Sequence, residues 1–345
     1  MHWKTKTRWG TWAPAALLIT AAVLAACRPR GEAVVIYTSV DQLFSEPVLE
    51  RFEEETGIEV RAVYDVEAAK TTGLVNRLIA EKNNPQADVF WNGEFAQTIA
   101  LAEQGVLAPY RSPNAAASLA VYRDPDGYWT GFAGRARVIL VNTDLVPESA
   151  MPSSIQDFLD PAWPSEQLGI ATPLFGTTAT QAAALYAHWG PVEGRAYFEA
   201  LAGRSIRVVD GNSVVRDMVA DGRLAFGLTD TDDACSAVDR GDPVRIIVPD
   251  QGPDQMGTLV IPNTVALVAS GPNPDAGRQL IDYLLSEPVA QALIDSGWSH
   301  VALGPAETRP DCLPGPAIRG MDVALADVVT QMVPAKTDMT DLFVR

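Results

Sequence analysis

The stretch Ala33–Tyr64, "AVVIYTSVDQLFSEPVLERFEEETGIEVRAVY", decides the fold. Its first seven residues form an apolar, β-branched run, which predicts a buried strand. Val48 and Phe52 then follow at helical spacing, and Gly57 is placed to end that helix. Residues 58–64 alternate between apolar and polar side chains, as a half-buried strand does. The stretch therefore predicts a β-α-β unit.

The same alternation of strands and helices continues along the chain. A second helix is predicted around residues 74–79, followed by a short buried strand at residues 87–93. Strands that alternate with helices predict a mostly parallel sheet with helices on both faces, which makes this an α/β protein. Further strands are predicted at residues 137–142, 168–173, 206–209, 224–228, 244–250 and 257–269, and further helices at residues 275–285 and 289–296.

The charge balance of the chain excludes one class of partner. The 345 residues carry a formal net charge of −17. Residues 1–26 hold three basic residues and no acid, so removing them leaves 23 basic against 43 acidic residues, a balance of −20. The phosphate backbone of nucleic acid binds positively charged surfaces, and this chain is strongly acidic, so we expect no nucleic-acid partner. The composition is globular, and the length is enough for two domains.

The N-terminus has the layout of an export signal. Lys4, Lys6 and Arg8 precede an apolar run at residues 15–26, which is too short to span a membrane. The run ends in "LAAC", which resembles a bacterial lipobox and implies cleavage before Cys27 and lipidation of its thiol. The alternative is an ordinary signal peptide in which Cys27 is incidental. We expect a protein of the cell envelope, on the periplasmic or extracellular side, held to the membrane by its lipid alone.

Two cysteines remain after this processing, Cys235 and Cys312. An exported protein lies in an oxidising compartment, where a disulfide between them can form. The sequence leaves open whether their Cα atoms lie close enough, so two free thiols are the alternative.

Motifs of common enzymes are missing from the sequence. The chain has no G-x-S-x-G, no P-loop and no G-x-G-x-x-G. His188 and His300 stand alone, without zinc-site spacing. We therefore expect no enzyme and no catalytic cofactor.

Polar residues follow four of the predicted elements where a ligand would bind, beyond the carboxyl ends of the strands. They occupy residues 38–41, 92–94, 176–178 and 229–233. In the third group, Gly176, Thr177 and Thr178 open an Ala-rich helix, whose N–H groups, hydroxyls and dipole favour an anion. The alternative is that one threonine only caps the helix.

The fourth group, within "GLTDTDDAC" (Gly227–Cys235), places three acids directly after a buried strand. One of them can cap the following helix, and a further acid in the first turn contributes about 0.3–1 kcal/mol. A helix start does not need all three acids, Asp230, Asp232 and Asp233. We therefore expect at least one of them to bind a ligand, and we expect Asp233 to be nearer a helix cap.

At this point the chain resembles a known family. Its elements appear in the order found in the substrate-binding proteins of bacterial ABC importers with the type II periplasmic-binding fold, and the likeness is greatest to the ferric-ion-binding branch and its phosphonate and thiamine relatives. The segments that carry the likeness are "VVIYTSVDQLFSEPVLERFEEETGIEV", "PQADVFWNGE", "GFAGRARVILVN", "DPAWPSEQLGIATPLFGTTATQAAAL" and "NSVVRDMVADGRLAFGLTDTDDA".

The resemblance assigns roles to individual positions. Asp41 falls where many ferric binders place a His ligand, and Glu94 lies at or beside their acidic ligand. Thr231 and Asp232 fall on the paired tyrosines that normally hold the iron, which is a departure from the family. Together the expected ligand or metal site comprises Asp41, Glu94, Asp230, Thr231 and Asp232, and the expected anion site comprises Ser39, Gly176, Thr177 and Thr178.

The sequence thus predicts a lipid-anchored, monomeric receptor that closes two lobes on ferric iron or another hard metal ion with a synergistic anion, and delivers it to an ABC permease. Residues 1–26 are the signal peptide and residues 27–32 a tether. Residues 33–136 with 265–310 form one lobe, and residues 137–264 with 311–345 form the other. The segments "RVILVN" and "VIPNTVALV" are the expected crossovers between the lobes.

Three alternatives stay open at this stage. Within the receptor class, the ligand is an amino-phosphonate or a similar small organic anion or zwitterion, whose ammonium group suits the carboxylates. In another class, the chain is a secreted hydrolase that uses Asp230 and Asp232 with a metal ion. In a third, it is a sensory or adhesion lipoprotein that binds a protein through an exposed apolar patch.

Overall fold

The protein was analysed as a computed structural model, which describes residues 1–2, 32–65, 72–301, 303, 310–313, 315 and 317–344. The export signal and Cys27 lie outside these residues. Residues 33–345 form one compact unit. In the described part of the chain, no helix combines the length and the apolar character that crossing a membrane requires.

The stretch that opened the sequence analysis folds as predicted. Strands β1 (Ala33–Thr38) and β2 (Glu59–Tyr64) are parallel neighbours. Helix α2 (Gln42–Thr56) connects them and ends at Gly57, which has a φ of 74° and donates its N–H to the carbonyl of Glu53. Glycine adopts this left-handed conformation without a steric penalty, which is why the helix stops there.

The strands join in a ten-stranded sheet in which eight strands follow the order β2-β1-β3-β10-β5-β8-β6-β7, while β4 pairs with β10 and β9 with β5. Strand β5 (Thr130–Asn142) is antiparallel to β10 (Val260–Val268) through Ala136, and antiparallel to β8 (Phe226–Asp230) from Arg137 onward. One strand therefore passes from one group of partners to the other. The lobe boundaries drawn from the sequence remain a prediction.

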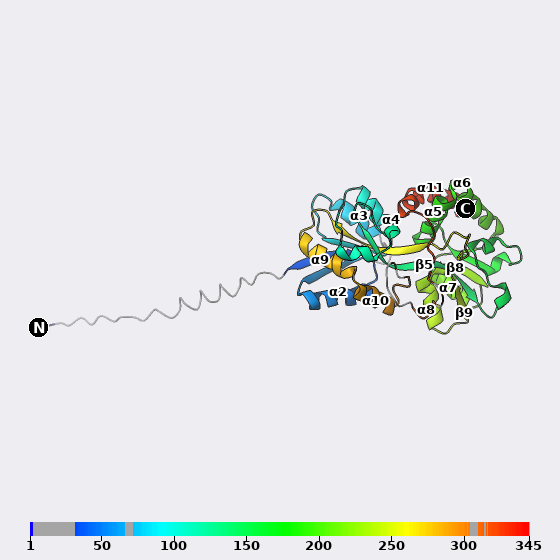
Figure 1. Ribbon diagram of the computed structural model, residues 1–345, viewed down its shortest axis with the longest axis horizontal. Helices are drawn as coiled ribbons and strands as arrows, with labels where there is room; N and C mark the ends of the chain where they lie inside the picture. The colour runs from blue at the N-terminus through cyan, green and yellow to red at the C-terminus, as the bar shows by residue number, and fades with distance from the viewer. Residues whose placement is uncertain are drawn as a thin grey trace. The chain divides into compact units, whose positions relative to one another are not determined.

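Helices cover the two groups of strands. In Figure 1, α5, α6 and α11 lie together near the C-terminus, and α7 and α8 lie beside β8. The C-terminal helix α11 and the helices α4 and α6 were not predicted. The remaining bounds are β3 (Val89–Asn92), β4 (Leu107–Ala108), β6 (Leu168–Ala171), β7 (Arg207–Val209), β9 (Val244–Ile247), α3 (Thr72–Ala80), α4 (Ala96–Glu103), α5 (Gly176–Trp189), α6 (Pro191–Arg204), α7 (Asn212–Ala220), α8 (Thr231–Asp239), α9 (Pro274–Leu284), α10 (Glu287–Asp295) and α11 (Leu325–Phe343).

The buried core follows this division only in part, because its largest cluster spans both groups of strands, from Tyr37 of β1 to Phe226 of β8, and two further clusters lie on one group each. One of these two includes Ile36, Phe52 and Leu280, from β1, α2 and α9. The other includes Val138 and Val219, from β5 and α7. Burying each such side chain stabilises the fold by roughly 1.5–3 kcal/mol, so both groups of strands carry their own apolar support.

Of the two states that the sequence leaves open for the cysteines, the structure has the disulfide. Cys235 in α8 and Cys312 form a disulfide, with their Cα atoms 5.3 Å apart. The bond ties α8 to a segment 77 residues further along the chain.

Candidate functional site

Strand β5 carries two arginines on one face. One residue separates Arg135 from Arg137, so both side chains point to the same side of the strand.

Strand β5 also contains a β-bulge just before these arginines. Ala133 is an extra residue in β5, because the register with β10 shifts between Pro262 and Asn263. Ala133 has a φ of 48°, a left-handed conformation that costs roughly 1–3 kcal/mol for a residue with a Cβ. A β-bulge of this kind re-aims the side chains that follow it.

Arg137 and Asp230 form a buried ion pair. The two residues lie directly opposite each other on β5 and β8, and Nη1 of Arg137 is 2.7 Å from Oδ1 of Asp230. The side chain of Arg137 is fully buried, and that of Asp230 is only 4% exposed. Each charge is tolerated inside the protein because the other is present.

Hydroxyl and amide groups surround this ion pair. Thr177 donates to Oδ2 of Asp230 at 2.6 Å and accepts from Arg137 at 3.1 Å. Asn212 donates to both Thr177 and Asp230, and Thr178 accepts from Arg137 at 3.3 Å. Helix α5 begins without a side-chain cap, so the capping role offered as an alternative for the threonines is wrong. Their hydroxyls instead satisfy the buried ion pair.

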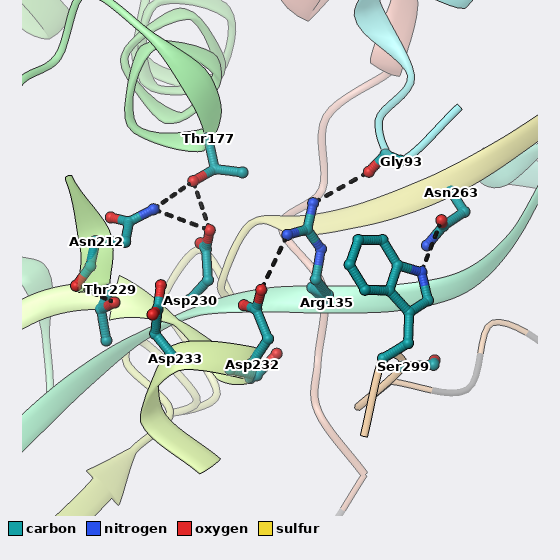
Figure 2. Close-up of polar contacts among 12 residues, drawn as sticks. Gly93, Arg135, Thr177, Asn212, Thr229, Asp230, Asp232, Asp233, Asn263 and Ser299 are labelled. Atoms are coloured by element: carbon teal, nitrogen blue, oxygen red, sulfur yellow. Dashed lines mark hydrogen bonds and ion pairs between the residues drawn. The ribbon is translucent and has the colours of Figure 1, made fainter. Parts of the chain in front are cut away.

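Arg135 connects the start of α8 with the end of β3. Its Nη1 lies 3.2 Å from Oδ2 of Asp232, and its Nη2 donates to the carbonyl of Gly93 at 3.1 Å. Figure 2 shows the guanidinium between these two acceptors. The guanidinium also lies 5.2 Å from the ring centroid of Trp298, within the range of a cation–π contact. Arg135 therefore contacts two residues that line the pocket described below, Asp232 and Trp298.

Asp233 has an arginine partner of its own. Its Oδ1 lies 3.0 Å from Nη1 of Arg216, and α8 begins without a side-chain cap, so the expectation that Asp233 caps the helix is wrong. Burial, with the nearby charges of Asp232 and Asp230, raises the pKa of Asp233 to about 7 despite this arginine. Each of the three acids after β8 is thus paired with a separate arginine, and one of the three carboxyls is still half protonated near neutral pH.

A pocket of about 440 Å³ lies beside these ion pairs. Asp232 and Asp233 from α8 line one side, and Asp41 and Phe44 from the start of α2 line another. The structure thus brings Asp41 together with Asp232, as expected from the sequence. The full lining is Asp41, Phe44, Asp232, Asp233, Cys235, Ser236, Asp239, Arg240, Ser296, Gly297, Trp298 and His300.

Three buried polar atoms in or beside this pocket have no hydrogen-bond partner among the described residues: Oδ1 of Asp232 and Nδ1 of His300, whose residues line it, and Nε of Arg135, which lies behind Asp232 and does not line it. Buried polar atoms are nearly always hydrogen-bonded, and an orphan atom calls for a ligand, ion or water that would complete it. The three atoms belong to one cluster, because Arg135 contacts Asp232, and Asp232 and His300 line the same pocket. The set offers an acceptor for a cation and a donor for an anion.

The charges in this cluster influence each other's protonation. Burial alone would raise the pKa of Asp232, but Arg135 and His300 outweigh that effect and hold the pKa below its usual value. Burial lowers the pKa of His300, against the attraction of Asp232. Asp232 is therefore ionised and His300 neutral at neutral pH, so the carboxylate and one ring nitrogen of these two pocket-lining residues each keep a lone pair for a ligand.

Other predicted site residues have their polar atoms engaged within the fold. The carboxylate of Glu94 accepts from the N–H groups of Ala96 and Gln97 at 2.6 and 2.9 Å, and so caps α4. The hydroxyl of Ser39 joins β1 to β3 through Asn92. Thr231 is fully buried. Neither Glu94 nor Ser39, Asp230, Thr231, Gly176, Thr177 or Thr178 lines the pocket that holds Asp41 and Asp232.

Sequence reasoning missed several residues of this site. Arg135 and Arg137 lie in the quoted segment "GFAGRARVILVN", where two arginines in an otherwise apolar strand signal buried charges that need acids. His300 was set aside as a lone histidine, yet only 5% of it is exposed. Arg216, Asn212, Phe44 and Trp298 carry no signal of their own in the sequence.

Comparisons with known proteins agree on one class. The sequence pattern of bacterial extracellular solute-binding proteins matches residues 48–305. The chain is similar to iron uptake protein A1 of Synechocystis sp., with 26% identity over 278 residues that cover 78% of this chain and 75% of the relative. It is also similar to a putative 2-aminoethylphosphonate-binding periplasmic protein of Salmonella typhimurium, with 25% identity over 81% of this chain and 82% of the relative.

A solved structure shows the same fold. A Trichodesmium protein in complex with iron and citrate ligands superimposes with a TM-score of 0.80 and 20% identity, over 91% of this chain and all of that one. The predicted architecture, a periplasmic-binding fold of type II, is thereby confirmed.

Proposed function

The chain belongs to the family of bacterial extracellular solute-binding proteins, and from this premise we propose that it is a lipid-anchored, monomeric receptor of an ABC importer that captures ferric iron or another hard metal ion together with an anion. The family and its relatives are binding proteins and not enzymes. The proposed cargo is a solute, and no catalytic cofactor belongs to the site.

The pocket's charge supports a positively charged cargo. Four carboxylates, those of Asp41, Asp232, Asp233 and Asp239, line it together with a single arginine, Arg240. Adding the arginines that pair with Asp232 and Asp233 gives four acids against three bases, and with Asp233 half protonated near pH 7 the balance is only slightly negative. Carboxylate oxygens are the ligands that hard cations prefer.

The single observation that carries the proposal is the pair of orphan atoms on Asp232 and Arg135. Oδ1 of Asp232 is a buried acceptor without a donor, and Nε of Arg135 is a buried donor without an acceptor. The same two side chains contact each other at 3.2 Å through their other atoms. A cation beside Asp232 and an anion beside Arg135 would complete both side chains at once.

A specific observation favours a second cargo, an amino-phosphonate or a similar zwitterion. The aromatic rings of Phe44 and Trp298 line the pocket with their centroids 5.2 Å apart. None of the described residues that line the pocket is a tyrosine, whereas the family resemblance implies paired tyrosines as iron ligands. Aromatic faces together with carboxylates suit an ammonium group, and a volume of 440 Å³ exceeds what a single ion needs.

Capture and release would use motion about β5 and β10. Asp41 and Asp232 line the pocket from α2 and α8, which attach to different groups of strands. A ligand that contacts both carboxylates binds the closed arrangement more tightly than an open one, and only such a difference can drive closure. The closed receptor would then deliver its cargo to the permease.

Native mass spectrometry of the purified protein, combined with metal analysis, tests the proposal. Iron or another hard metal retained at one ion per chain, together with the mass of an anion, would support the leading cargo. A metal-free complex whose added mass matches an organic zwitterion would favour the second. Asp254→Asn, in an exposed carboxylate outside the pocket lining, serves as a control that should retain wild-type occupancy, whereas Asp232→Asn should lose it.

A further inference from the structure

A second group of metal-ligating side chains lies at the edge of the pocket. Cys235, His300 and Cys312 each offer one ligand atom, and these three atoms lie within 4.8 Å of one another. Cys235 and His300 are buried and line the pocket, and Cys312 is half-buried. In the structure a disulfide joins the two sulfurs, so they are not available as ligands in this oxidised state.

Reduction would turn this group into a metal donor set. Two thiolates and one imidazole are one of the donor sets found in three-ligand zinc sites, which leave a fourth position open. Two thiolates on one tetrahedral zinc ion lie about 3.8 Å apart, given zinc–sulfur distances of about 2.3 Å. With the Cα atoms of Cys235 and Cys312 5.3 Å apart, rotation of the side chains can provide that separation without moving the backbone.

The histidine is held in place for this role. The backbone N–H of His300 donates to the carbonyl of Gly134 at 2.9 Å, and its neighbour Ser299 donates to the same carbonyl through its hydroxyl. Nδ1 of the imidazole is buried without a hydrogen-bond partner in the described part of the chain. A buried imidazole beside two sulfurs, on an anchored backbone and with its Nδ1 unpartnered, is a feature that a disulfide alone does not require.

We propose that Cys235, Cys312 and His300 form a redox-gated binding site for zinc or another thiolate-preferring metal ion, closed by the disulfide and opened by its reduction. The ligand atoms of this site are two sulfurs and an imidazole nitrogen at the edge of the same pocket, and none of them belongs to Asp41 or Asp232, so the site does not rest on the function proposed above. Zinc and cuprous copper are the ions that thiolates select.

The opening step is a thiol–disulfide exchange with a dithiol reductant. A thiolate of the reductant attacks Sγ of Cys312, the more exposed sulfur, forming a mixed disulfide while Cys235 leaves as a thiolate. The reductant's second thiol then attacks the mixed disulfide, which releases Cys312 and leaves the reductant as a disulfide. One divalent ion then binds both sulfurs and the imidazole, and the protons of the two thiols are released.

The test is zinc binding by the purified chain with and without prior reduction. A Cys27→Ser background removes the third cysteine, so that Cys235 and Cys312 are the only thiols. After treatment with a phosphine reductant, which does not bind zinc as a thiol would, we expect one additional zinc ion per chain over the oxidised sample. Cobalt added in place of zinc should give the thiolate-to-cobalt charge-transfer absorption that carboxylate sites lack.

Variants assign the ligands. His300→Asn keeps both cysteines and should weaken zinc binding of the reduced chain at least about 100-fold, since even the loss of an outer-shell partner costs 10- to 100-fold. His188→Asn, in a histidine on α5 outside this group, should bind like the parent. Equal zinc uptake by the oxidised and reduced chains, or equal affinity of the reduced parent and His300→Asn, would overturn the proposal. Neither result would bear on solute binding by the oxidised protein.

Discussion

Arg137 and Asp230 face each other across adjacent antiparallel strands, and their ion pair of 2.7 Å is buried together with the hydroxyl of Thr177. This relationship explains why a carboxylate ends the buried strand β8. The acid neutralises an arginine that β5 places inside the protein, 93 residues away in the sequence. The first acid of the cluster therefore supports the structure, and the second and third face the pocket.

Removal of one partner should destabilise the fold strongly. Arg137→Met leaves Asp230 buried without a counter-charge, and we expect a loss of about 3–5 kcal/mol in the free energy of unfolding, measured by denaturant titration. The double variant Arg137→Met, Asp230→Leu should recover part of this loss. Arg51→Met, which breaks an exposed ion pair on α2, should change stability little. A similar effect of Arg137→Met and Arg51→Met would show that the buried pair has no such role.

Stability of the empty protein should depend on pH through Asp233. Its pKa rises from 3.8 to about 7 on folding, so between these values the folded state binds more protons than the unfolded state. The free energy of unfolding therefore falls as pH rises from about 4 to 7, by up to roughly 4 kcal/mol from this group.

Asp233→Asn should remove that dependence, so its stability relative to the wild type should increase steadily over the same pH range. Thermal unfolding of both proteins between pH 4 and 8 measures the difference. The opposite contribution of His300, whose pKa is lowered, is common to both and cancels in the comparison. A constant difference across the range would mean that Asp233 titrates in the folded protein as it does in the unfolded one.

Binding of a cationic cargo should release a proton. A cation beside Asp233 favours its ionised form, so at pH 6, below its pKa of about 7, nearly one proton should leave per ligand bound. Calorimetric titration in buffers with different ionisation enthalpies counts these protons. The number should drop at pH 8 and in Asp233→Asn. Proton uptake, or release that is unaffected by this substitution, would place the ligand elsewhere.

Membrane attachment should depend on Cys27. The basic and apolar segments before "LAAC" predict lipidation of this thiol, and the residue lies outside the part of the chain that the structure describes. In a bacterial host the wild type should fractionate with membranes, and Cys27→Ser should appear in the soluble periplasmic fraction. Continued membrane association of Cys27→Ser would contradict the lipid anchor.

Local signals made much of the fold predictable. The apolar run before Ser39 predicts strand β1, and Gly57 predicts the end of helix α2 and the start of β2. Both signals concern only residues close to them in the sequence. Helix α11 escaped prediction, and Pro334 inside it is a residue that usually interrupts a helix.

The site was harder to predict because its pairs are distant in the sequence. Asp232 could be recognised as a surplus acid, but its partner Arg135 is 97 residues away, and no local pattern indicates that β5 and α8 meet. Glu94 is the opposite case, because its carboxylate accepts from N–H groups only two and three residues away, at the start of its own helix, and the predicted ligand role overlooks this local contact. The partners of each carboxylate, and not its residue type alone, decide which of them face the pocket.

The central claim, that the pocket between Asp41 and Asp232 binds a positively charged solute, is tested most directly by calorimetric titration of the wild type and Asp232→Asn. The titrants are ferric citrate, divalent metal ions and 2-aminoethylphosphonate. The account predicts saturable binding of a cation-bearing titrant to the wild type, weakened roughly 10- to 100-fold in Asp232→Asn by the loss of a charge-assisted contact. Equal binding by both proteins, or no binding of any of these titrants to the wild type, would contradict it.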